Sequence, residues 1–140
     1  MRIMGLDYGA KTVGVAISDP LLLTAQGVEV IRRGREDKER RSLARIEELI
    51  CEYSVSRIVL GMPCHMDGRM GERAQKTLAF KEKLERRSGL EVILVDERLT
   101  TAEAMEQMDE AGTPKAKQKD YVDMIAAALI LEEYMKMHNA

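Results

Sequence analysis

Two acidic residues interrupt apolar runs of this sequence, and a third acid follows one. Asp7 comes after the run Ile3–Leu6, and Asp123 is the one acid between Val122 and Leu131. Glu97 directly follows the strand-like run Glu91–Val95 and Asp96. Burying a carboxylate is costly unless it is paired or binds a metal. Carboxylate oxygens are the hard ligands that Mg²⁺ or Mn²⁺ prefers.

Three carboxylates from distant parts of a chain suggest metal-dependent hydrolysis of phosphodiester bonds. Two ions about 3.5–4 Å apart can activate a water and stabilise the leaving oxygen, so the reaction needs no nucleophilic side chain. No Ser/His/Asp set is evident, and His138 lies in the C-terminal tail. His65 lies in the glycine-rich segment 61–71 and is better explained as a loop residue or a substrate contact than as a general base.

Each acid also has a structural explanation. As a structural residue, Asp7 would be the acid of a hairpin turn. Asp123 would stabilise the helix dipole or form an ion pair with Lys119. For both we favour the functional interpretation, because a turn acid would lie inside the turn and a dipole needs no inward-facing acid. Glu97 could equally be a solvated loop acid, and the adjacent Asp96 competes with it, so this choice stays open.

The elements that must position these residues follow the order β-β-β-α-β-α-β-α-α. Strand patterns cover 2–8, 13–18, 27–32, 57–60 and 91–95, and helical patterns cover 36–53, 72–87, 100–110 and 117–137. Helical spacing places Asp123 at the head of a face formed by Ala126, Ala127, Ile130 and Tyr134. Its alanines allow close approach to a sheet. The order predicts a mixed sheet covered by helices and parallel in its second half, with sites at carboxyl strand ends.

Composition sets the broad class. The chain has 140 residues, 45% hydrophobic and 33% charged, which predicts one soluble domain over 1–140. No apolar stretch is long enough for a membrane span, and a strand pattern starts at the N-terminus where a signal peptide would lie. Cys51 and Cys64 form no C-x-x-C pair, so we expect a reducing, cytoplasmic location.

The net charge of −2 disfavours global attraction to nucleic acid, but basic residues cluster locally. The clusters are Arg32, Arg33, Arg35, Lys38, Arg40, Arg41 and Arg45; Arg69, Arg73, Lys76, Lys81, Lys83, Arg86 and Arg87; and Lys115, Lys117 and Lys119. Such patches can meet a phosphate backbone. For most individual residues we favour solvated helix faces with ion pairs.

Five motifs in order resemble the YqgF family, the Holliday-junction-resolvase-like proteins also described as pre-16S rRNA nucleases. They are Gly5-Leu6-Asp7-Tyr8-Gly9; Gly61-Met62-Pro63; Met66-Asp67-Gly68 with Gly71 and Arg73-Ala74; Asp96-Glu97-Arg98-Leu99-Thr100-Thr101; and Val122-Asp123 before Ala126-Ala127. Each motif alone is weak, but together they span nearly the whole chain with matching spacing.

The resemblance implies a ribonuclease-H-like α/β fold, with a mixed five-stranded sheet in the order 3-2-1-4-5. It implies that Asp7, Glu97 and Asp123 form an acidic triad that binds Mg²⁺ or Mn²⁺ and hydrolyses precursor ribosomal RNA, in 5′-end maturation of 16S rRNA. The implied phosphate or substrate contacts are Lys11, Arg73, Arg98, Thr100 and His65.

Two departures from the family pattern matter. His65 stands where the family more often has Asn, and Gly61-Met62-Pro63 stands where related resolvases end the fourth strand with an acid. We infer that Gly61 leaves room for Glu97 to reach across.

Alternative functions are resolution of branched DNA junctions, a non-catalytic nucleic-acid-binding module, and an ATP-binding phosphotransferase-like domain. The last is disfavoured because that fold uses two domains. The sequence is compatible with a monomer or a homodimer.

Overall fold

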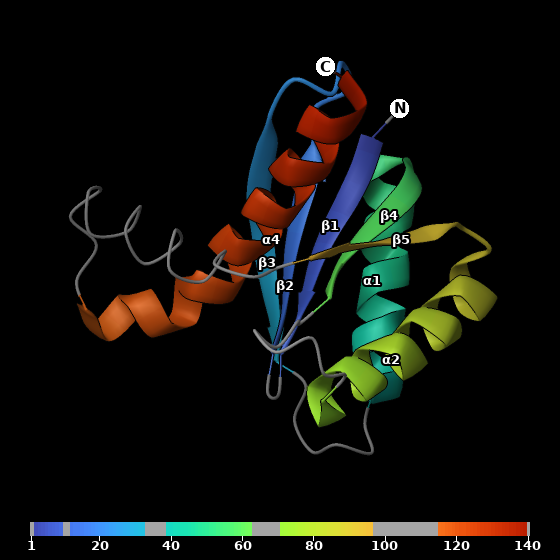
Figure 1. The fold of residues 1–140 in the computed structure, drawn as a ribbon, viewed down its shortest axis with the longest axis vertical. Helices are drawn as coiled ribbons and strands as arrows, with labels where there is room; N and C mark the ends of the chain where they lie inside the picture. Colours follow the sequence, from blue (N-terminus) through green and yellow to red (C-terminus); the bar gives the residue numbers. More distant parts are fainter. Residues whose placement is uncertain (1, 10–11, 33–38, 63–70, 97–114, 140) are drawn as a thin grey trace.

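The computed structural model describes residues 2–9, 12–32, 39–62, 71–96 and 115–139. It contains a five-stranded sheet and three helices in the described part of the chain (Figure 1). The elements are β1 (Arg2–Tyr8), β2 (Thr12–Ser18), β3 (Ala25–Arg32), α1 (Glu39–Tyr53), β4 (Val55–Met62), α2 (Glu72–Ser88), β5 (Val92–Asp96) and α4 (Lys115–Asn139). The predicted helix over 100–110 lies outside the described residues.

The strands lie in the order β3-β2-β1-β4-β5, which confirms the predicted sheet. β1 pairs with β2, and β2 with β3, in antiparallel fashion, whereas β1 pairs with β4 and β4 with β5 in parallel. Strands β1, β3, β4 and β5 therefore all end at the same side of the sheet. We call this side the carboxyl edge; Asp7, Arg32, Met62 and Asp96 lie at these strand ends.

The predicted boundaries agree with the structure to within a few residues. Ser42, Leu43, Ile46 and Leu49 are the buried residues of α1, and the three apolar ones recur at helical spacing. Gly89 ends α2 in the left-handed conformation, with φ of 72°, and its N–H donates to the Glu85 carbonyl at 2.9 Å. No described helix is long and apolar enough to cross a membrane.

The two faces of the sheet carry different cores. Helices α1 and α2 cover one face, where Met4, Leu6 and Tyr8 of β1 join a buried cluster with Phe80 of α2. Helix α4 covers the other face (Figure 1), where Ile3 belongs to a second cluster. This alternation is the two-residue period of a strand buried on both sides.

Small residues form a row across the sheet beneath α4. Gly5 pairs with Ala16, which pairs with Gly27. A Cβ at Gly5 would lie 2.8 Å from both the Ala127 carbonyl oxygen and Leu131 Cβ. A Cβ at Gly27 would lie 2.4 Å from Met124 Cγ. The helix therefore approaches the strand backbone directly, as its alanines predicted.

Candidate active site at the carboxyl edge

Asp7 is a buried acid near the end of β1. It pairs with Gly14 of β2, and the residue is 6% exposed. The hairpin turn lies beyond it and is closed by a hydrogen bond from Gly9 N to Thr12 O at 2.8 Å. Asp7 thus belongs to the strand and not to the turn, which argues against its explanation as a hairpin acid.

Strand alternation assigns Asp7 to the face that α4 covers. Ile3 and Gly5, which share its parity, both lie on that face. The backbone of Asp123 lies in α4, one turn before Ala127, whose carbonyl oxygen approaches Gly5. Figure 1 shows the C-terminal end of α4 beside the start of β1 and its first turns extending away from the strands on the side of β3. Ala127 lies over Gly5 of β1 and Met124 lies over Gly27 of β3, so the helix crosses the sheet.

The third predicted acid, Glu97, lies outside the described residues, as do Lys11, His65, Arg98 and Thr100. Its competitor Asp96 is exposed at the end of β5 and is in register with Met62. Gly61, noted above as a departure from the family pattern, is buried and in register with Val95. β5 therefore leads the chain out at the carboxyl edge immediately before Glu97.

Asp7 is the one member of the predicted triad whose side chain the structure describes. Among the described side chains, no group of three or more His, Cys, Asp or Glu residues forms a metal site. The meeting of Asp7, Glu97 and Asp123 therefore remains a prediction.

Tyr8 anchors the end of β1 from the opposite face, a role that the sequence analysis missed. Its ring lies 4.3 Å from that of Phe80, measured between centroids, and its hydroxyl donates to the Glu39 carboxylate. Glu39 also accepts from Lys83 Nζ at 2.8 Å. These contacts tie the strand that carries Asp7 to both α1 and α2. Strand alternation was the one signal that could have placed Tyr8 opposite Asp7.

Exposed arginines lie near the carboxyl edge on the face that α1 and α2 cover. Arg73 lies in the first turn of α2, the helix that follows β4. Arg40 and Arg41 lie in the first turn of α1, which the bond between Tyr8 and Glu39 holds beside the end of β1. We call Arg40, Arg41 and Arg73 the basic rim.

Other basic residues form ion pairs, mostly on solvated helix faces, as the sequence predicted for most of them. Arg45 donates to both Glu29 oxygens, at 2.9 and 2.7 Å, and to Glu48 at 2.8 Å. These hydrogen bonds hold the pKa of Glu29 below its ordinary value despite partial burial. Further pairs are Lys81–Glu85 at 3.1 Å, Lys83–Glu39 at 2.8 Å, Arg87–Glu47 at 2.5 Å and Arg57–Glu91 at 3.9 Å. Arg45 is thus largely neutralised, whereas the basic rim faces solvent.

Known proteins resemble the chain over nearly its whole length. The family model "RuvX: Holliday junction resolvase" matches residues 1–137. A protein of Agathobacter rectalis is 57% identical over 135 residues, which cover 96% of this chain and 94% of the relative. A protein of Lachnospira eligens is 53% identical over 136 residues, covering 97% of each chain. Both carry the name "Putative pre-16S rRNA nuclease".

Solved structures share the fold at low sequence identity. T. thermophilus RuvC in complex with a Holliday junction substrate aligns with a TM-score of 0.64 at 16% identity, covering 100% of this chain and 98% of the other. The fowlpox virus Holliday junction resolvase aligns with a TM-score of 0.58 at 19% identity, covering 99% of each chain. These similarities confirm the ribonuclease-H-like fold. With the near-complete sequence matches, they establish that the chain belongs to the RuvX family, predicted above from its motifs under the name YqgF.

Proposed function

We propose that this chain is a nuclease of one domain that hydrolyses phosphodiester bonds during 5′-end maturation of precursor 16S rRNA. The observation that carries the proposal is the buried carboxylate of Asp7 at the carboxyl edge, with the exposed basic rim near the same edge. The names of the close relatives support precursor 16S rRNA as the substrate.

The site fits a hard divalent cation. Asp7 brings carboxylate oxygens to a strand end, and Mg²⁺ and Mn²⁺ bind a few carboxylates and complete their coordination with water and phosphate. Asp7, Glu97 and Asp123 would hold the ions. When bound, the ions supply an activated water and stabilise the leaving oxygen.

The chain itself positions the substrate. Guanidinium groups bind phosphates through paired charge-assisted hydrogen bonds, so the basic rim would hold the RNA backbone beside the cleaved bond, on the side of α1 and α2. Lys11, Arg98, Thr100 and His65 are further candidates for such contacts. Burial of Asp7 on the α4 face limits the rotation of its side chain.

Cleavage of a 5′-extended 16S rRNA precursor with Mn²⁺ or Mg²⁺ tests the proposal. We expect wild-type protein to shorten the precursor and Asp7→Asn to do so at least about 100-fold more slowly, because a lost metal ligand removes the activated water. Glu52→Gln is the control, since this acid is exposed in the last turn of α1, away from the carboxyl edge. Full activity in Asp7→Asn, with an unchanged melting temperature, would remove Asp7 from the mechanism.

Resolution of DNA junctions is the second candidate, favoured by the description of the family model. A four-way DNA junction in the same assay separates the two substrates. Faster cleavage of the junction than of the precursor RNA would favour the resolvase.

A further inference from the structure

The start of α1 carries two arginines of the basic rim but no apolar anchor. Its first three residues are Glu39, Arg40 and Arg41, and the buried residues of the helix begin only at Ser42 and Leu43. The hydroxyl of Ser42 has no hydrogen-bond partner among the described residues, so it does not hold this turn either. Among the described contacts, the position of the two arginines therefore depends on polar links.

The carboxylate of Glu39 supplies links to two neighbouring elements. Tyr8 Oη donates to Glu39 Oε1, and Lys83 Nζ donates to Glu39 Oε2 at 2.8 Å. One oxygen thus holds the end of β1, and the other holds α2. The Glu39 side chain is only 17% exposed, which limits the screening of these charge-assisted hydrogen bonds by solvent.

A further link between the two helices comes from Arg87 of α2. It pairs with Glu47, which lies two turns beyond Glu39 and farther from the carboxyl edge. Arg87 also donates to the carbonyl oxygen of Arg40, but at 3.5 Å this hydrogen bond is long. Glu39 is therefore the described side chain that ties the start of α1 to the strand that carries Asp7.

We propose that Glu39 is a positioning residue for RNA binding. Its carboxylate, held by Tyr8 and Lys83, fixes the two arginines at the start of α1 relative to Asp7. The inference rests on the proposed function, which makes these arginines phosphate contacts. It also explains why an acid stands beside them, since a negative charge in a phosphate-binding surface repels the substrate unless it has another role.

Charge and positioning predict opposite results for Glu39→Ala. If Glu39 acted only through its charge, its removal would strengthen RNA binding. If it positions the arginines, the KM for the 5′-extended 16S rRNA precursor should rise about five- to tenfold, because charge-assisted contacts to phosphate are weakened. The value of kcat should stay within about twofold of wild type, because Asp7 keeps its pairing with Gly14.

Tyr8→Phe tests the link to β1 without changing any charge. The new ring keeps the contact with Phe80, whose centroid lies 4.3 Å away, so the core stays filled. We expect KM to rise about threefold or more, because Glu39 loses its hydrogen bond to the strand. Tyr53→Phe is the matched control: it removes a hydroxyl from the last turn of the same helix, away from the carboxyl edge, and should leave KM unchanged.

A double-mutant cycle separates positioning from a general loss of stability. In a variant with Arg40→Gln and Arg41→Gln, the groups to be positioned are absent. Adding Tyr8→Phe to this variant should therefore raise KM by less than about 1.5-fold. All variants are compared at a temperature where each is folded.

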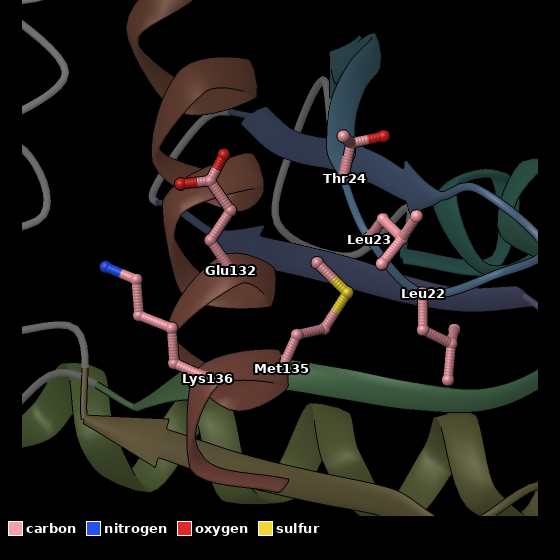
Figure 2. A pocket seen from close by; sticks show the side chains of 6 residues that line it. All are labelled: Leu22, Leu23, Thr24, Glu132, Met135 and Lys136. Atoms are coloured by element: carbon pink, nitrogen blue, oxygen red, sulfur yellow. The ribbon is translucent and has the colours of Figure 1, made fainter. Parts of the chain in front are cut away.

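Lys136→Gln controls for the loss of a positive charge. Lys136 lies at the other end of the sheet, at a pocket of about 420 Å³ between α4 and the turn that joins β2 and β3 and includes Leu21 and Leu23. Figure 2 shows its ammonium group pointing outward from α4, beside the carboxylate of Glu132. Because salt screens exposed charges over such distances, this variant should bind RNA like wild type.

Equilibrium binding of the same RNA in EDTA distinguishes a failure of this inference from a failure of the proposed function. If wild-type protein binds the precursor without cleaving it, the proposed function fails, and dissociation constants take the place of KM in every comparison. A wild-type protein that neither binds nor cleaves this RNA would overturn both.

The inference alone is overturned if wild type cleaves the precursor while KM is unchanged in Glu39→Ala and Tyr8→Phe. An equal effect of Tyr8→Phe with and without the two arginines would also overturn it, because the hydroxyl would then act independently of them. If Glu39→Ala does not fold, Tyr8→Phe and its cycle decide the question.

Discussion

The two faces of the sheet pack by opposite means. On the face beneath α1 and α2, large side chains such as Leu6 and Phe80 fill the space between layers and are fully buried. On the α4 face, Gly5 and Gly27 have no side chain of their own, which lets Ala127 O and Leu131 Cβ approach the first and the Met124 side chain approach the second. The first face supplies most of the large buried side chains, while the second fixes where α4 lies, and with it the backbone of Asp123.

This difference predicts opposite sensitivities to side-chain volume. The α1–α2 face should lose stability when a side chain is shortened, because a cavity remains. The α4 face should lose stability when a side chain is added, because the neighbouring atoms include helix backbone.

The largest loss of stability is expected for Leu6→Ala. Leu6 is fully buried on the α1–α2 face, and such truncations cost about 2–5 kcal/mol of unfolding free energy. Urea unfolding measures this loss. Because α4 keeps its place, RNA cleavage by folded Leu6→Ala should stay near the wild-type rate. A large drop in the cleavage rate at temperatures where this variant is folded would contradict the proposal that the α4 face, and not the α1–α2 face, positions Asp123.

Gly5→Val should cost about 1–3 kcal/mol, because its Cβ would meet the Ala127 carbonyl oxygen, a backbone atom that cannot rotate away. Here the rate of cleavage should also fall, by about tenfold or more, because α4 must move and carry Asp123 with it. The measurement is cleavage and urea unfolding of the same preparation, with Leu6→Ala as the control. Wild-type cleavage by Gly5→Val would show that the position of α4 does not matter.

Gly27→Ala is expected to cost less, about 1 kcal/mol, because the added methyl meets the Met124 side chain, which can rotate. Met124→Ala should therefore reduce the cost of Gly27→Ala, a coupling that a double-mutant cycle detects. If the losses of unfolding free energy in the two single variants add up to the loss in the double variant, the contact between position 27 and Met124 is contradicted.

The smallest effect concerns acid stability. Hydrogen bonds from Arg45 lower the pKa of Glu29 from its ordinary 4.5. A lowered folded-state pKa contributes stability above the unfolded-state pKa, and this stability is lost as the pH falls through the folded-state value. Glu29→Gln should therefore lose less stability than wild type between pH 7 and pH 3, with a difference below about 1 kcal/mol because the pair is partly exposed.

Urea unfolding at the two pH values measures that difference. Glu52→Gln, at an exposed position on α1, is the control and should follow wild type. Equal acid sensitivity in Glu29→Gln and wild type would contradict the role of the Arg45 pair.

Periodicity predicted the elements and the buried positions well. The spacing of Ala127, Ile130 and Tyr134 identified the covered face of α4, because a helix repeats every 3.6 residues whatever lies beneath it. The close contact at Gly27 was not foreseen, since it depends on where α4 crosses β3. The ion pair of Arg45 was likewise hidden, because Glu29 lies on a neighbouring strand and not on the same helix.

The candidate site was predictable in part. The burial of Asp7 followed from an acid within an apolar run, and the structure shows it in the strand. Whether Glu97 and Asp123 meet it depends on the path of the chain after β5 and on side-chain directions, which no periodic pattern determines. Their meeting is the central claim of this account.

Paramagnetic broadening by Mn²⁺ in amide NMR spectra tests that claim most directly. We predict that substoichiometric Mn²⁺ broadens the signals next to Asp7, Glu97 and Asp123 together, spares those of Leu21 and Leu23, and loses this pattern in Asp7→Asn. Broadening around one acid alone, or an unchanged pattern in Asp7→Asn, would contradict a shared metal site.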